Sequence, residues 1–76
     1  MPWLVTVQLT VTCADRPGLL SSIARTFLRY EVNLHDARIT TLGQRAEDVF
    51  IVTNKKFAEP AFAKEFRDEL VKELRP

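Results

Sequence analysis

The residues whose types and spacing could do chemistry gather in one short segment, Cys13 to Leu20, between a strand-like run and a helix-like run. Asp15 offers a carboxylate that can accept hydrogen bonds from an ammonium group. Pro17 suits the first turn of a helix, where its missing N–H would have had no partner. Gly18 does not, since glycine inside a helix costs roughly 0.5–1 kcal/mol relative to alanine. Helix propensity therefore does not explain why Gly18 stands at this position.

We expect this segment to place the free N–H groups of a helix N-terminus at one end of a sheet, where they can bind a carboxylate. Gly18 would leave these amides uncovered, and Asn33, at the start of the next strand, could donate and accept hydrogen bonds. Together with Asp15 these groups match a free amino acid. Two structural alternatives stay open: Asp15 could be the helix N-cap, or Gly18 could only let helix and sheet pack closely.

Other chemistries find little support in the sequence. The single histidine, His35, has no serine or cysteine nearby, so we interpret it as a structural or surface residue. The single cysteine, Cys13, continues the apolar parity of its strand and is interpreted as a small core residue. Glu47 and Asp48 are adjacent in a predicted strand and would point to opposite faces, so they cannot converge for acid–base work. We predict no catalytic residue, no metal site and no cofactor.

Length and charge limit the remaining possibilities. The chain has 76 residues and a formal net charge of +1, so we expect one domain, residues 1–76, and no strong attraction to nucleic acid or an anionic membrane. No stretch approaches the ~20 apolar residues of a membrane span, and the first ten residues do not resemble a signal peptide. We expect a cytoplasmic domain, and the immediate start of the first strand suggests a piece of a larger protein.

The first two elements follow from hydrophobic periodicity. Strict alternation predicts a strand over residues 3–13, and helical spacing predicts a helix over residues 18–30. One face of the strand holds Trp3, Val5, Val7, Leu9, Val11 and Cys13. The apolar face of the helix holds Leu19, Leu20, Ile23, Ala24, Phe27 and Leu28, with Ser21, Ser22, Arg25 and Arg29 opposite.

A second strand is predicted over residues 32–42, but its apolar parity changes along its length. A bulge near His35 or Asp36 would reconcile the two halves. Gly43 then supplies the positive φ of a tight turn.

A third strand is predicted over residues 47–53, where apolar residues occupy both parities, as in a strand covered on both faces. It has one phenylalanine and no basic residue, which argues against an RNA-reading sheet. Residues 54–59 are predicted as a loop. A last helix begins at Pro60, with Phe62, Phe66, Leu70 and Leu74 recurring every four residues.

The order strand, helix, strand, strand, helix predicts an α+β, ferredoxin-like βαββα fold with an antiparallel sheet and two helices on one face. The fourth strand of that arrangement is missing, which would leave the strand over residues 3–13 as an exposed edge. Exposed edges invite pairing with another chain. Both this edge and the doubly apolar third strand indicate a partner surface: a second copy, or neighbouring parts of a larger protein.

Two stretches carry a family resemblance: "DRPGLLSSIARTF", residues 15–27, and "NLHDARITTLGQRAEDVFIVTN", residues 33–54. They resemble the ACT domain, a small regulatory module that binds amino acids, and most closely the last ACT domain of bifunctional PII uridylyltransferase/uridylyl-removing enzymes. The resemblance implies glutamine sensing in nitrogen control, with no catalysis in this chain. It also implies pairing with another ACT domain, in tandem or as a homodimer.

The resemblance also implies which residues bind the ligand. In the family the amino acid lies where two ACT domains meet, at the loop after the first strand and the start of the second. Transferred by motif, the ligand-binding residues are Asp15, Arg16, Pro17, Gly18, Leu19 and Asn33. The backbone around Gly18 and Leu19 would bind the carboxylate, Asp15 the amino group, and Asn33, from the facing domain, would complete the pocket. The alternatives are a structural dimerisation module and a free-standing ACT domain with another amino-acid ligand.

Overall fold

The structure, a computed structural model, describes residues 5–75. Trp3, which we placed in the first strand, lies outside the described residues. The elements in chain order are β1 (Val5–Ala14), α1 (Leu19–Arg29), β2 (Asn33–Leu42), β3 (Arg45–Asn54), the short 3₁₀ helix η1 (Lys55–Ala58) and α2 (Pro60–Leu74). The predicted βαββα order is confirmed.

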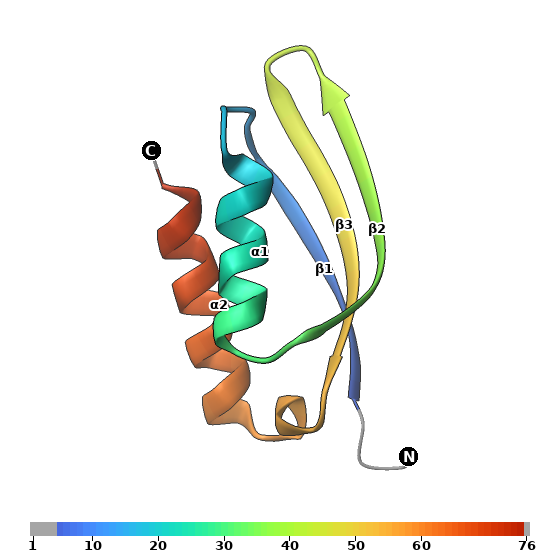
Figure 1. Ribbon diagram of the computed structural model, residues 1–76, viewed down its shortest axis with the longest axis vertical. Helices are drawn as coiled ribbons and strands as arrows, with labels where there is room; N and C mark the ends of the chain where they lie inside the picture. Colours follow the sequence, from blue (N-terminus) through green and yellow to red (C-terminus); the bar gives the residue numbers. More distant parts are fainter. Residues whose placement is uncertain (1–4, 76) are drawn as a thin grey trace.

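The described strands form an antiparallel sheet in the order β1-β3-β2, and both long helices cover the same face of it (Figure 1). β3 is central, so β1 and β2 each have one side of the backbone unpaired within the described chain. The predicted exposed edge at β1 is confirmed. The bulge in β2 is confirmed as well, because the register against β3 shifts between Leu34 and Asp36.

β3 is longer than predicted, and its two faces differ. Its residues Ala46, Phe50 and Val52 are buried toward the helices, whereas Val49 and Ile51 on the opposite face are half-buried. The prediction that a partner covers this second face stays a prediction. The helices cover one face, and the other face gains only partial shelter from neighbouring side chains on the sheet.

The core is an aromatic cluster centred on Phe66 of α2, whose side chain is 1% exposed. The Phe66 ring lies 5.9 Å from Phe27 and 5.5 Å from Phe57, measured between ring centroids. Phe50 of β3 meets the Phe27 ring edge to face at 5.5 Å, an arrangement that adds to simple area burial. This cluster joins α1, α2, η1 and the sheet, so it fixes where the helix ends lie.

α1 is rotated relative to the prediction. Its buried residues are Leu19, Ser22, Ile23, Thr26 and Phe27. Leu20, Ala24 and Leu28, which we placed on the apolar face, are exposed, and Ser22, which we placed opposite, is buried. The reason is that the sheet and α2 together cover the side of the helix that contains Ser22 and Thr26. The buried Thr26 hydroxyl finds a partner within the helix, because it donates to the Ser22 carbonyl at 3.2 Å.

The segment predicted as a loop over residues 54–59 instead contains η1. The Asn54 side chain accepts a hydrogen bond from the Lys56 amide at 2.7 Å, which caps this turn. Val71, next to Leu70 in α2, is exposed. No helix in the described part of the chain is long and apolar enough to cross a membrane.

Candidate functional site

The short loop Asp15–Gly18 connects β1 to α1 at one end of the sheet. The Asp15 amide donates to the Gln44 carbonyl at 2.8 Å, so this loop lies against the β2–β3 hairpin turn. Figure 1 shows both connections at the same end of the molecule. The Asp15 carboxylate is exposed there. The predicted position of the loop, with the N-terminus of α1 at the sheet end, is confirmed.

Gly18 is the N-cap of α1 and has the left-handed conformation, with φ +80° and ψ 3°. A Cβ atom built on this residue would meet no heavy atom within 4 Å. Close helix–sheet packing therefore does not explain the glycine, and Asp15 is not the N-cap; both structural alternatives are wrong. The residue is glycine because other residues rarely adopt this backbone conformation.

Within residues 5–75, the open amides at this helix start belong to Leu20 and Ser21. The Leu19 amide donates to the Arg16 carbonyl at 3.2 Å, and the first helical hydrogen bond runs from Ser22 to the Gly18 carbonyl at 3.0 Å. Leu20 and Ser21 donate to no acceptor among the described residues, and Gly18 has no side chain to cap them. A carboxylate would therefore bind two residues later than the expected Gly18 and Leu19, at the amides of Leu20 and Ser21.

Arg16 points away from this loop. Its Nη2 atom donates to the Glu73 carbonyl near the end of α2, at 2.8 Å. This contact satisfies one of the last carbonyl groups of the helix and ties the loop to α2. The side chain of Arg16 is thus engaged in the fold, and the Asp15 carboxylate and the amides of Leu20 and Ser21 are open polar groups of this loop and helix start.

Asn33 lies at the other end of the sheet. It is opposite Thr53 of β3, which in turn is opposite Thr6 of β1, whereas the loop follows Ala14. Eight residue steps at about 3.3 Å each separate Thr6 from Ala14, so Asn33 and Asp15 are more than about 26 Å apart within one chain. Asn33 instead borders a separate hollow of about 250 Å³, lined also by Tyr30, Glu31, Asn54, Lys55 and Lys56.

The remaining polar candidates have structural surroundings. The His35 Nε2 atom lies 2.8 Å from the Thr53 hydroxyl at the β2 bulge. Cys13 is half-buried and packs against the core, as predicted. No group of three or more His, Cys, Asp or Glu side chains suited to a metal ion occurs within residues 5–75.

Tyr30, at the C-terminal end of α1, has an altered ionisation. Desolvation and the Glu65 and Glu69 carboxylates raise the pKa of the Tyr30 hydroxyl above its ordinary value, while Arg29 acts in the opposite direction. The hydroxyl therefore stays protonated throughout the neutral range.

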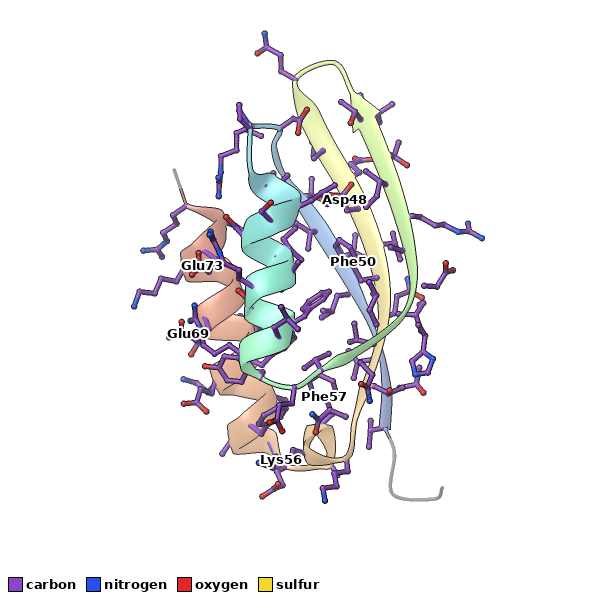
Figure 2. All side chains as sticks on the ribbon, viewed as in Figure 1. Asp48, Phe50, Lys56, Phe57, Glu69 and Glu73 are labelled. Atoms are coloured by element: carbon purple, nitrogen blue, oxygen red, sulfur yellow. The ribbon has the colours of Figure 1, made fainter. Side chains whose placement is uncertain are left out.

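The sequence analysis missed one buried carboxylate. Asp48 is 1% exposed, and its Oδ1 atom accepts a hydrogen bond from the Thr40 amide at 3.3 Å. Figure 2 shows Asp48 and Phe50 on the helix-covered side of the sheet. The signal was available, because Asp48 shares its parity in β3 with Phe50 and Val52.

Large exposed hydrophobic side chains gather on β2 and on the flank of α1 that faces away from α2. Arg29 binds Glu69 and Glu73 of α2, at 3.1 and 3.4 Å, and so marks the flank of α1 that faces α2; Figure 2 labels both glutamates. The flank that faces away from α2 carries Leu20 and Leu28, the latter 78% exposed. On β2 the exposed apolar residues are Leu34, Ile39 and Leu42. Of these, Leu34 and Ile39 are opposite buried residues of β3 and so lie on the helix side of the sheet.

Comparison with known proteins shows which family and which proteins the chain is similar to. The ACT-domain family matches residues 7–61. The chain is 44% identical over 69 residues to a bifunctional uridylyltransferase/uridylyl-removing enzyme of Ectopseudomonas mendocina, and 42% identical over 69 residues to that of Pseudomonas syringae pv. syringae. Each alignment covers 87% of this chain and 8% of the relative. The chain thus spans a small part of the length of these relatives.

Solved structures share the fold. An unknown protein from Galdieria sulphuraria superposes over 93% of this chain and 39% of its own, with a TM-score of 0.79 and 18% identity. A putative glycine cleavage system transcriptional repressor superposes over 88% of this chain and 37% of its own, with a TM-score of 0.71 and 19% identity. At these identities the likeness concerns the fold alone.

Proposed function

The chain belongs to the ACT-domain family, and from that premise we propose that it is an amino-acid sensor that binds its ligand between two ACT domains. Glutamine is the favoured ligand, by resemblance to the last ACT domain of the uridylyltransferase/uridylyl-removing enzymes. In this proposal the chain is the regulatory part of a larger enzyme of nitrogen control. The observation that supports it most strongly is the separation of Asp15 and Asn33 within one chain.

The exposed side chains of Leu34 and Ile39 on the helix side of β2, together with Leu20 and Leu28, support pairing through β2 and the adjoining flank of α1. Leu42, opposite Arg45, lies on the other face of the sheet. Apolar side chains gathered in one patch are typical of interaction sites. β2 is also an edge of the sheet, with unpaired backbone groups along its outer side. A second copy related by a two-fold axis would pair β2 with β2 in antiparallel register and bury both patches against each other.

The same two-fold axis would complete the site. Antiparallel pairing centred on β2 places Asn33 of one copy beside Leu42 of the other, at the end of the sheet that carries the Asp15 loop. Asn33 would then lie three strand spacings from Ala14 of the other copy, about 14 Å between backbones. Two side chains and one amino acid can span that gap. The ligand carboxylate would bind the Leu20 and Ser21 amides, and its ammonium group would bind Asp15.

A ligand held between two domains can regulate attached regions. It favours whichever arrangement of the two domains it binds more tightly, by an amount equal to its difference in affinity. The binding energy comes from both domains, so the ligand and the domain pair stabilise each other. In a larger enzyme this coupling would pass to the catalytic regions through the positions of the two ACT domains.

Isothermal titration with glutamine, together with sedimentation at the same protein concentration, tests the proposal. We expect saturable binding that Asp15→Ala and Asn33→Ala each weaken by about tenfold or more, as for loss of a hydrogen bond to a charged group. Both positions are exposed, so both variants should fold. Lys64→Ala, another exposed residue outside the site, is the matched control. A folded, dimeric chain that binds neither glutamine nor another free amino acid would instead support the dimerisation module.

A further inference from the structure

A second hollow lies at the outer edge of β1, next to the loop that carries Asp15 but on the side of that loop that faces α2. It has a volume of about 410 Å³ and lies between the end of β1 and the end of α2. Its walls are Thr12, Cys13, Ala14, Arg16, Val71, Leu74 and Arg75. The strand contributes a backbone edge that no described element pairs with, because β1 ends the sheet order.

The walls of this hollow combine apolar side chains with positively charged ones. Val71 is 46% exposed and Leu74 is half-buried, so α2 presents aliphatic surface beside the strand. Arg16 and Arg75 supply two guanidinium groups and no acidic residue lines the hollow. Such a surface favours a partner with aliphatic side chains and a carboxylate.

Arg16 has unused hydrogen-bonding capacity at this place. Its Nη2 atom donates to the Glu73 carbonyl, but its Nε atom is buried and has no acceptor among the described residues. A buried donor without a partner destabilises the folded state. A carboxylate that enters the hollow and binds Arg16 side-on, at Nε and Nη2, would supply the missing acceptor.

We propose that an extended segment of another polypeptide, with a carboxylate between aliphatic residues, adds to the sheet beside β1 and fills this hollow. Its backbone would pair with the free edge of β1, its aliphatic side chains would cover Val71 and Leu74, and its carboxylate would bind Arg16 and Arg75. Strand addition of this kind takes affinity from main-chain hydrogen bonds and specificity from alternate side chains. The proposal does not depend on amino-acid binding, because it uses the other edge of the sheet.

A second copy fits this hollow less well. β1 itself contains no acidic residue, so a β1–β1 pair would bring no carboxylate to the two arginines. Pairing β2 of another copy with β1 would join unlike edges, and such head-to-tail contacts form open-ended assemblies rather than closed dimers. The charge of the hollow therefore favours a different chain.

The test uses the peptide GSVTETVTS with an N-terminal fluorescein, in which the two valines and the glutamate share one face of the strand; it is titrated with the 76-residue chain and followed by fluorescence anisotropy. We expect saturable binding that is weakened about tenfold or more in the peptide GSVTKTVTS and in the protein variant Val71→Glu. Ala61→Glu, the same kind of change at an exposed residue at the other end of α2, should bind like the unchanged protein. NMR shifts should concentrate on residues 12–14.

Two outcomes would overturn this inference. One is equal affinity for the glutamate and lysine peptides, or no binding of either. The other is self-association of the chain that Val71→Glu abolishes in sedimentation, which would assign the hollow to a second copy. Glutamine titration of the Val71→Glu variant separates this result from the proposed function, since that binding should be unchanged.

Discussion

Replacing Gly18 with alanine tests the reason for the glycine in the β1–α1 loop. The residue has φ +80°, a conformation that costs an L-residue about 1–2 kcal/mol. No steric clash adds to this, because a Cβ meets nothing within 4 Å. Alanine also stiffens the unfolded chain, which returns roughly 0.4–1 kcal/mol. The net loss in the free energy of unfolding should be about 1 kcal/mol, or about 4–8 °C in Tm.

Gly43 offers a matched control for this change. It also has a positive φ, +64°, and a Cβ there would likewise meet nothing within 4 Å. Urea unfolding followed by circular dichroism should therefore give similar losses for Gly18→Ala and Gly43→Ala, and a smaller one for Gly18→Asn, since asparagine adopts this conformation more readily. A Gly18→Ala protein as stable as the original, or one that loses more than about 3 kcal/mol, would refute this account of the loop.

Two further changes test other parts of the structure. Leu28→Glu should change the free energy of unfolding of the monomer by less than about 0.5 kcal/mol, because the side chain is 78% exposed. It should, however, shift the monomer–dimer equilibrium toward monomer in sedimentation. An unchanged dimer would contradict pairing through this flank. Tyr30→Phe should reduce the loss of stability between about pH 9 and about pH 11. The folded state holds the Tyr30 proton more tightly than the unfolded state, so deprotonation favours unfolding as the pH rises through 10. Equal pH dependence in both proteins would contradict the raised pKa.

Periodicity predicted the order of elements well because β1, α1 and α2 each repeat their pattern over ten or more residues, and Gly43 marks the turn between the two remaining strands. It mispredicted which side chains are buried where several neighbouring elements pack against one helix or strand. α1 has a broad apolar arc, and only the arrangement of α2 and the sheet decides that Ser22 is buried while Leu28 is exposed. The parity of Asp48 in its strand could have predicted that its side chain points into the core. Carboxylates are rarely buried, however, so sequence reasoning favours a surface position for this residue.

The site was predicted in part. The loop residues Asp15–Gly18 were placed correctly at the helix start, and the structure identifies which backbone amides are open. The side chain of Arg16 could not be placed from sequence, because its partner is a carbonyl 57 residues away in α2. The distance between Asp15 and Asn33 follows from strand order, which local patterns do not contain. In the proposed site, the pairing of two domains brings these residues together.

The central claim is that the glutamine site is shared between two domains. Mixing two variants that each have weakened glutamine binding tests this claim most directly. Asp15→Ala and Asn33→Ala homodimers each have two defective sites, but a mixed dimer has one site with both side chains intact. Equal amounts of the two proteins, mixed and allowed to exchange subunits, should regain about a quarter of the original glutamine sites in isothermal titration, by random pairing. A mixture that binds no more glutamine than the separate variants would contradict a site shared between two domains.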